Sequence, residues 1–394
     1  AEARADALAD ELSLIRPAMI ALRDAWQADR TGAGVYAELI AEGFTADRFK
    51  AARTALSQFE AATITQDIDA AAWAAQGDGD AFGRKVEKAA EAQQVRITQA
   101  LGRLFETVAH EIEAGLAAPV AVVFEAGRDG QASALRIAYV KSPTFSDHAP
   151  FLHLDGTGDH DMAEAVFGPM RLERHRVERL ATVTQVIKTF SNQSITGKNK
   201  RGDLIGGNLS WQAPALRRDL IAFAHAKPSA LVVGNKTVIE TLKAEGLQNP
   251  TAHFGALRGQ NDWEDLAEVI LVGREQLPPQ AVELKARAFA SKAGVPFQTI
   301  EGNYPEAERA LRMRSGPPVL IKTRHHPDPW ADRVLSQTRD AEALQAIDRV
   351  RPMFEAATVY VLAALCLDLT VDAVASRAEL KAGGDRIART IAQA

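Results

Sequence analysis

Apolar residues in the first part of the chain are spaced for helices. They recur every three or four residues near the amino terminus, at Leu8, Leu12, Ile15, Met19 and Leu22, which places them on one face of an amphipathic helix. Further helices are expected over residues 36–42, 46–61 and 81–116, with breaks at Gly32, Gly34 and the GDGD of residues 77–80. Residues 1–118 are therefore predicted to form an all-α region, and no motif in it indicates a chemistry.

At residue 119 the pattern changes to short β-branched runs that alternate with helices. PVAVVFEAG and SALRIAYV, separated by GRDGQA, predict a β-hairpin. Further strands are expected in PFLHLDGTG, RHRVERLATVTQVIKTFS, ALVVG, EVILVG and PFQTI, and helices near residues 160–168, 212–226, 279–293 and 337–350. This alternation predicts an α/β fold in which helices cover both faces of a parallel sheet. Working residues are then expected beyond the carboxyl ends of the strands.

Composition changes this picture only slightly. With 394 residues, 46% of them apolar, the chain can bury more than one core. Its net charge of −5 neither indicates nor excludes nucleic acid, because only one groove needs to be positive. The lone Cys366 excludes an internal disulfide framework and favours a cytoplasmic location. The sequence contains no uninterrupted apolar run of about 18 residues, so no membrane-spanning helix is expected. The initial Ala favours either a chain trimmed at its amino end or the downstream part of a longer reading frame.

Two loops carry residue types suited to phosphate chemistry. In HFGALRGQNDWEDLAEVILVG, residues 253–273, Gly255 and Gly259 permit close backbone approach, and Arg258 offers a planar guanidinium. QAIDRVRP, residues 345–352, places Gln345, Arg349 and Arg351 at the end of a helix. The plainer alternatives are a simple turn for the first loop and a solvated helix surface for the second.

Together these segments resemble motifs V and VI of superfamily 2 helicases, especially the helicase-like proteins of phages, plasmids and integrated elements. VGREQLPP at 272–279 and LCLDLTVDAVA at 365–375 are similar to further pieces of that group. LHLDGTGD at 152–159 resembles motif III, and ALVVGNKTVIETLKAEG at 230–246 resembles the strand and helix of motif IV. The resemblance covers about residues 150–375, with its motifs in the expected order.

The resemblance implies a division of the chain into lobes. Residues 119–178 would close a first RecA-like lobe and contain the hairpin, residues 179–365 would form a complete second RecA-like lobe, and residues 366–394 a mostly helical tail. The implied function is the C-terminal motor part of an ATP-dependent DNA helicase or translocase in the replication of a mobile element. RNA is not excluded as the substrate, and the implied cofactors are ATP and Mg.

The resemblance also implies roles for individual residues. Arg351, or else Arg349, would act as an arginine finger on the γ-phosphate, and Gln345 would sense the nucleotide. The residues expected to bind nucleotide or to couple its hydrolysis to movement are Asp155, Thr157, Asp159, Gly259 and Asn261. The residues expected to contact nucleic acid, mainly through phosphate, are His253, Arg258, Asn235, Lys236, Lys198, Lys200 and Arg201. The last three lie in GKNKRG, for which a solvated turn is the alternative.

Some positions depart from the helicase pattern. The sequence contains no GxxxxGK[ST] phosphate-binding loop and no acid pair after a clear strand. Ala346 and Asp348 replace an arginine and a glycine of motif VI, and Gly156 and Gly158 replace alanines of motif III. The chain alone is therefore expected not to hydrolyse nucleotide. Either an upstream motor lobe supplies the loop, or the chain is an inactive nucleic-acid-binding or assembly module. A third alternative, an unrelated nucleotide-binding α/β enzyme, would need a Gly-rich loop after its first strand.

Other constellations are weaker. His325 and His326 with Asp328 and Asp332 are interpreted as a polar loop, and no metal site is expected. A hydrolase site built on the histidines near residue 153 lacks a nucleophile on a strand-to-helix turn. Trp211, Trp263 and Trp330 are expected to pack in cores more readily than to stack on bases.

Overall fold

The computed structural model describes residues 2–59, 97–127, 130–144, 151–175, 177–187, 190–198, 203–205, 208–257 and 259–381. The chain divides into two compact units. The first comprises Ala1–Thr144, Glu164–Pro169 and Glu283–Thr299, and the second comprises Phe145–Ala163, Met170–Val282 and Ile300–Ala394. Among the described residues, no helix combines the length and apolarity that crossing a membrane requires.

In its described residues, the first unit is mainly helical and carries one hairpin. Its elements are α1 (Glu2–Asp29), α2 (Val35–Ala41), a helix at residues 46–59, α5 (Ile97–Glu113), β1 (Val122–Ala126) and β2 (Ala132–Ile137). The predicted face of α1 is confirmed, since Leu8, Ile15 and Leu22 are buried. The predicted hairpin is also confirmed, with β1 and β2 antiparallel. The helix expected over 81–116 is described only from Ile97 onward.

A buried carboxylate joins three segments of this unit. Glu111 of α5 is fully buried and accepts a hydrogen bond from the hydroxyl of Tyr36 at 2.6 Å. The same carboxylate accepts the backbone N–H groups of Val120 at 3.1 Å and Ala121 at 2.7 Å. Because buried donors need acceptors, Glu111 fixes α2 and the entry to β1 against α5.

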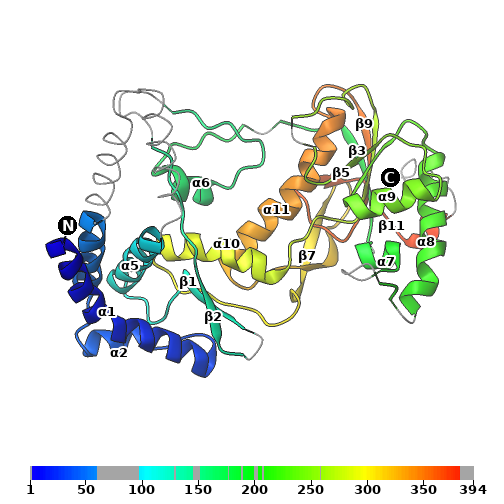
Figure 1. Ribbon diagram of the computed structural model, residues 1–394. Coiled ribbons are helices and arrows are strands. Elements are labelled where there is room, and N and C mark those ends of the chain that lie inside the picture. Colours follow the sequence, from blue (N-terminus) through cyan, green and yellow to red (C-terminus); the bar gives the residue numbers. More distant parts are fainter. Residues whose placement is uncertain are drawn as a thin grey trace, which may run out of the picture. The chain divides into compact units, whose positions relative to one another are not determined.

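The second unit contains a six-stranded sheet, all of whose strands are parallel. The strand order is β11-β3-β9-β6-β4-β5. The strands are β3 (Ala181–Val186), β4 (Leu231–Gly234), β5 (Thr251–His253), β6 (Glu268–Val272), β9 (Ala357–Leu362) and β11 (Ala373–Ala375). This sheet and its helices form the expected RecA-like α/β arrangement (Figure 1).

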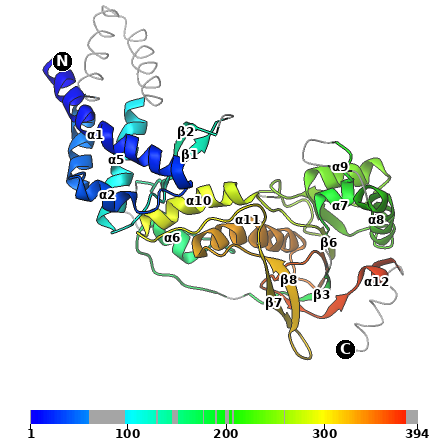
Figure 2. The same ribbon diagram turned by 90° about the horizontal axis from the view of Figure 1, so that it is seen from below.

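Alternation along the strands assigns their side chains to the two faces. A row across the sheet joins Val183, Val359, Val269 and Leu231, and all four pack with Ala343, Ala346 and Ile347 of α11 (Pro329–Ile347). The neighbouring row includes Tyr360, Ile270 and Val232. It packs with α7 (Asn192–Thr196), α8 (Asn208–His225) and α9 (Lys236–Ala244). In Figure 2, α7, α8 and α9 form one group and α11 lies apart from it. Helices therefore cover both faces, as a parallel sheet requires.

A smaller sheet was not predicted. Its strand order is β10-β7-β8, from β7 (Glu306–Met313), β8 (Val319–Arg324) and β10 (Thr370–Val371). β7 and β8 form an antiparallel hairpin, and β10 joins β7 in parallel. The remaining helices are α6 (His160–Phe167), whose residues are divided between the two units, α10 (Pro279–Lys292), which belongs to the first unit from Glu283 onward, and α12 (Arg377–Lys381) of the second unit.

Several sequence expectations need correction. PFLHLDGTG is no buried strand: its described residues, 151–158, lack regular structure, and Leu152 and Leu154 are 77% and 82% exposed. PFQTI is also not a strand, and Phe297 instead stacks on the guanidinium of Arg287, 4.6 Å from the ring centre.

The expected division into lobes also differs from the observed units. The hairpin expected to close a first RecA-like lobe belongs to the helical unit. Residues 366–381, expected to be mostly helical, contain β10 and β11 before α12. The run LTVDAVA contains both strands: β10 pairs with β7, and β11 pairs with β3.

The buried carboxylate leads to a first prediction. Replacing Glu111 by Ala leaves three donors without an acceptor, which should lower the free energy of unfolding of the first unit by about 3 kcal/mol or more. Hydrogen exchange across α2 and α5 measures this change. The control is Glu106→Ala, which removes a surface carboxylate paired with Arg53 and Arg103 and should cost less than about 1 kcal/mol. Equal effects of the two changes would contradict the role of Glu111.

Tyr36 gives a second prediction, on alkaline stability. Burial, together with the charge of Glu111, raises the pKa of Tyr36 well above its usual value of 10. The stability that the protonated tyrosine contributes is therefore complete below pH 10 and falls as the pH rises further, by up to about 1.4 kcal/mol per pH unit. Tyr36→Phe should be less stable than the wild type at pH 8, and denaturant unfolding should show the difference shrinking above pH 10. A difference independent of pH would contradict this coupling.

Candidate functional site

β4 and β6 are neighbours in the sheet, and the connections that follow their carboxyl ends run toward opposite sides of it. β4 connects outward to β5, and β6 connects back toward β9. Ligands of open α/β sheets bind at such points. Gly273, directly after β6, has φ +76°, and a Cβ built on it would lie 2.5 Å from the carbonyl oxygen of Phe190. Only glycine allows the segments that follow β3 and β6 to lie this close.

Several of the residues expected to contact nucleic acid lie at this edge. Asn235 follows β4 and donates its side-chain amide to Asn192 Oδ1 at 2.7 Å, which joins the segments after β4 and β3. His253 ends β5 beside Gly234, with its Nδ1 3.0 Å from the carbonyl oxygen of Phe254. Lys236 is exposed, 3.9 Å from the carboxylate of Glu240.

The loop GKNKRG is only partly covered by the structure. Lys198 is described and exposed. Lys200, Arg201 and also Arg258 of the loop before β6 lie outside the described residues. The edge therefore offers Asn235, Lys236, His253 and Lys198 as the described candidates for phosphate contact.

The segment resembling motif III packs against the helix that carries the motif VI resemblance. Gln345 of α11 donates its Nε2 to Thr157 Oγ1 at 2.9 Å. Arg333, three turns earlier on the same helix, pairs with Asp159 at 2.9 Å. Asp155 Oδ1 accepts the backbone N–H of Thr157 at 2.8 Å, which closes a tight turn. The structure thus brings together the predicted residues Asp155, Thr157, Asp159 and Gln345, although 188 positions separate Thr157 from Gln345.

The two candidate finger arginines lie at the opposite edge of the sheet. Pro352, next to Arg351, accepts the N–H of Leu180 at 2.7 Å, immediately before the amino end of β3. Arg349 donates to the carbonyl oxygen of Gln260 at 2.8 Å, and Arg351 forms an ion pair with Glu264. Working residues were expected at the carboxyl ends only. These arginines depart from that expectation because α11 runs antiparallel to the strands, so its last turn reaches their amino ends.

Gly259 and Asn261 belong to the loop that these arginines contact. Gly259 has φ +74° with open space around it. The carbonyl oxygen of Asn261 accepts the N–H of Glu264 at 3.4 Å. Farther back in the same loop, the N–H of Gly255 donates to Glu342 of α11 at 2.7 Å. The loop resembling motif V is therefore held along the second half of α11.

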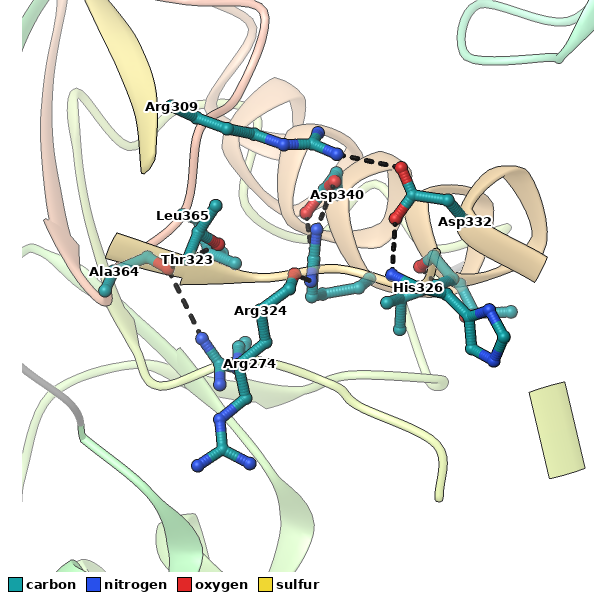
Figure 3. A network of polar contacts seen from close by, with 12 residues as sticks. Arg274, Arg309, Thr323, Arg324, His326, Asp332, Asp340, Ala364 and Leu365 are labelled. Carbon is teal, nitrogen blue, oxygen red and sulfur yellow. Dashed lines mark hydrogen bonds and ion pairs between the residues drawn. The ribbon is translucent and has the colours of Figure 1, made fainter. Parts of the chain in front are cut away.

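An arginine network beyond the carboxyl ends of β6 and β9 was not predicted (Figure 3). Arg339 of α11 is almost fully buried, forms two hydrogen bonds to Asp340 at 2.6 and 2.8 Å, and donates to the carbonyl oxygen of Arg324 at 2.6 Å. Arg274, directly after Gly273, donates to the carbonyl oxygen of Ala364 at 3.3 Å. Thr323 donates to the same oxygen at 3.2 Å.

Electrostatics distinguish Arg274 within this network. Burial, followed by the charges of Arg339 and Arg324, lowers the pKa of Arg274 to about 10. Burial also raises the pKa of the neighbouring Glu275, with a further contribution from Glu342. Shifted ionisation equilibria that cluster in one place are typical of functional sites. The sequence signal was available in VGRE, but the resemblance assigned no role to its arginine.

Three of the four residues considered for metal binding, His326, Asp328 and Asp332, have structural partners. Asp328 caps α11 by accepting the N–H of Ala331 at 3.0 Å, and His326 Nδ1 accepts the N–H of Asp328 at 3.1 Å. Asp332 accepts the N–H of His326 at 3.0 Å and pairs with Arg309 at 2.8 Å. Within α6, potential ligand atoms of His160, Asp161 and Glu164 lie within 4.8 Å of one another. Such groupings are common on helix surfaces, and Asp161 is paired with Arg333 at 2.5 Å.

No family model, no curated protein and no solved structure matches this chain. The assignment of function therefore depends on the motif resemblance and on the geometry of the second unit.

The close approach at Gly273 gives a third prediction. Gly273→Ala should destabilise the second unit by more than about 2 kcal/mol, because a left-handed conformation is strained for alanine and the new Cβ meets a backbone oxygen. Gly255→Ala is the matched control, since Gly255 has φ +81° with nothing within 4 Å of the added Cβ. It should show only the conformational cost, about 1–2 kcal/mol. Chemical denaturation of both variants measures the difference, and equal losses would contradict the contact with Phe190.

Proposed function

We propose that this chain is the C-terminal motor part of an ATP-dependent DNA helicase or translocase that acts in the replication of a mobile element. The observation that carries the proposal is the hydrogen bond between Gln345 and Thr157. It joins the segments that resemble motifs VI and III on one RecA-like lobe. Such a contact is needed if the nucleotide state is to control the binding of nucleic acid. The proposed setting is cytoplasmic, and RNA remains an alternative substrate.

The α11 contacts support a mechanical role for the lobe. Gln345 and Arg333 hold the turn at residues 155–161 at two points along one helix. A displacement of α11 would therefore move this turn with it. At the carboxyl edge, Asn235, Lys236, His253 and Lys198 would contact the nucleic-acid backbone, because a motor grips phosphate and does not read sequence.

ATP and Mg do not fit the described residues of this chain alone. No glycine-rich loop with a following lysine and serine or threonine occurs in the sequence, and Arg349 and Arg351 are already held by Gln260 and Glu264. A phosphate-binding lobe supplied as a partner would hold both cofactors. Under the proposal, Arg351 would exchange Glu264 for the nucleotide when the two lobes meet.

A second candidate is a nucleic-acid-binding module that kept the fold without catalysis. The observation that favours it is the ion pair of Arg351 with Glu264, which engages the proposed finger within the chain itself. This candidate predicts DNA binding without any dependence of nucleotide turnover on Arg351.

The fourth prediction tests the finger. In the protein assembled with its phosphate-binding lobe, Arg351→Ala should lower DNA-stimulated ATP hydrolysis by about 10³-fold or more, while ATP binding stays nearly unchanged. Steady-state hydrolysis and equilibrium binding measure the two quantities. The control is Arg312→Ala, because Arg312 forms an exposed pair with Asp368 and should leave both unchanged.

Three results would redirect the proposal. Normal turnover in Arg351→Ala would transfer the role to Arg349. Hydrolysis at helicase-like rates by this chain alone would contradict the requirement for a partner lobe. DNA binding with no hydrolysis in the assembled protein would favour the non-catalytic module.

A further inference from the structure

Two arginines of the second unit lie close together with little to neutralise them. Arg274 and Arg324 are both half-buried. The hydrogen bond of the Arg274 side chain is a long one, 3.3 Å to the carbonyl oxygen of Ala364. Across the described residues, the Arg324 side chain makes no hydrogen bond or ion pair. A guanidinium carries five donors, so most of the donors of this pair have no acceptor among the residues that the structure describes.

The nearby charges do not cancel those of the pair. Arg339 adds a third guanidinium, but Asp340 binds it through two hydrogen bonds. Glu306 lies opposite Arg324 in the register of β7 and β8. The repulsion that Arg274 experiences from Arg339 and Arg324 is nevertheless larger than its attraction to Asp340 and Glu306. The neighbouring positive charges therefore act on Arg274 more strongly than the neighbouring negative charges of Asp340 and Glu306 do.

The position of the pair is also that of a binding site. Arg274 follows β6 at the point where the sheet connections diverge, and Arg324 ends β8 beside Thr323, which contacts the segment after β9. The loops that follow the two arginines each hold a buried polar atom that lacks a hydrogen-bond partner, Gln276 Oε1 and His325 Nδ1. Buried polar atoms normally have partners, so both loops carry a polar atom whose hydrogen-bonding capacity is not used among the described residues.

We propose that Arg274 and Arg324 form a binding site for a phosphate group. The guanidinium fork matches two oxygens of a tetrahedral phosphate, and a dianionic or monoanionic ligand would relieve the repulsion between the two cations. The phosphate belongs either to a nucleotide or to a nucleic-acid backbone. This site does not depend on the motor proposal, since neither Arg349 nor Arg351 takes part in it.

The fifth prediction tests the site in the full chain with three probes: inorganic phosphate, ATP without divalent cations, and a short oligothymidylate. Calorimetry measures the first two, and fluorescence anisotropy of a labelled oligonucleotide the third, at low ionic strength. Arg324→Gln should weaken binding roughly tenfold, the effect of losing one charge-assisted contact. Glu306→Gln should strengthen binding roughly twofold by removing a nearby carboxylate. Arg312→Gln, an exposed arginine paired with Asp368, should leave binding unchanged.

The probes separate the two sources of phosphate. Loss of ATP and inorganic phosphate binding with intact oligonucleotide binding assigns the site to a nucleotide, and the reverse assigns it to a nucleic-acid backbone. Binding of all three probes by Arg324→Gln within a factor of two of the wild type would overturn the proposal. So would a wild type that binds none of them.

Thermal unfolding gives an independent readout. Without phosphate, Arg324→Gln should unfold at the same temperature as the wild type or higher, because it removes repulsion and breaks no hydrogen bond or ion pair among the described residues. Added phosphate should raise the unfolding temperature of the wild type more than that of the variant. A variant that is less stable than the wild type without phosphate would show a structural role and overturn the site. DNA binding without ATP hydrolysis in the assembled protein would overturn the motor proposal and leave these results in place.

Discussion

Burial of both faces of one parallel sheet constrains everything else in the second unit. The valine row through β3, β9 and β6 packs on α11, and the adjacent row packs on α7, α8 and α9. Parallel strands need long crossovers, so every connection passes from one edge of the sheet to the other. The chain is thereby forced to expose loops at two separate edges. The carboxyl edge receives Asn235, His253 and Arg274, and the amino edge receives the end of α11 with Arg349 and Arg351.

A series of hydrogen bonds connects the buried sheet to the loops at its carboxyl edge. Gln185 is 2% exposed within β3 and donates to the carbonyl oxygens of Ala363 and Leu365 at 3.0 and 2.6 Å. The carbonyl oxygen between them, that of Ala364, then accepts from Thr323 and Arg274. A buried amide without acceptors would cost about 1–3 kcal/mol, so the loop after β9 is held firmly. The one hydrogen bond that Arg274 makes among the described residues therefore goes to a loop that Gln185 already holds.

The sheet could be predicted from the sequence because its strands are short β-branched runs whose burial on both faces leaves few polar positions. The β7–β8 hairpin could not, because EAERALRM alternates charged and small residues on a largely exposed surface. For PFLHLDGTG the sequence wrongly predicted a strand. Its apolar residues alternate as in a strand, but its described residues pair with no other strand. At the site, the motif resemblance gave Gln345 and Thr157 as candidates. The burial of Arg339 and the isolation of Arg324 depend on contacts between distant segments, which no local pattern contains.

Under the proposed motor function, the separation of the two edges would divide the work of the second unit. Residues that grip nucleic acid must lie on the lobe's own binding edge, whereas a finger acts on a phosphate held by another lobe and can project from elsewhere. To act as a finger, Arg351 would have to break its ion pair with Glu264, which costs free energy. Both side chains of the pair are well exposed, 45% for Arg351 and 40% for Glu264, and such pairs contribute at most about 1 kcal/mol. A γ-phosphate, with its higher charge in a site from which water is excluded, competes easily at that cost. The pair is therefore compatible with a resting position that a nucleotide-loaded partner lobe displaces.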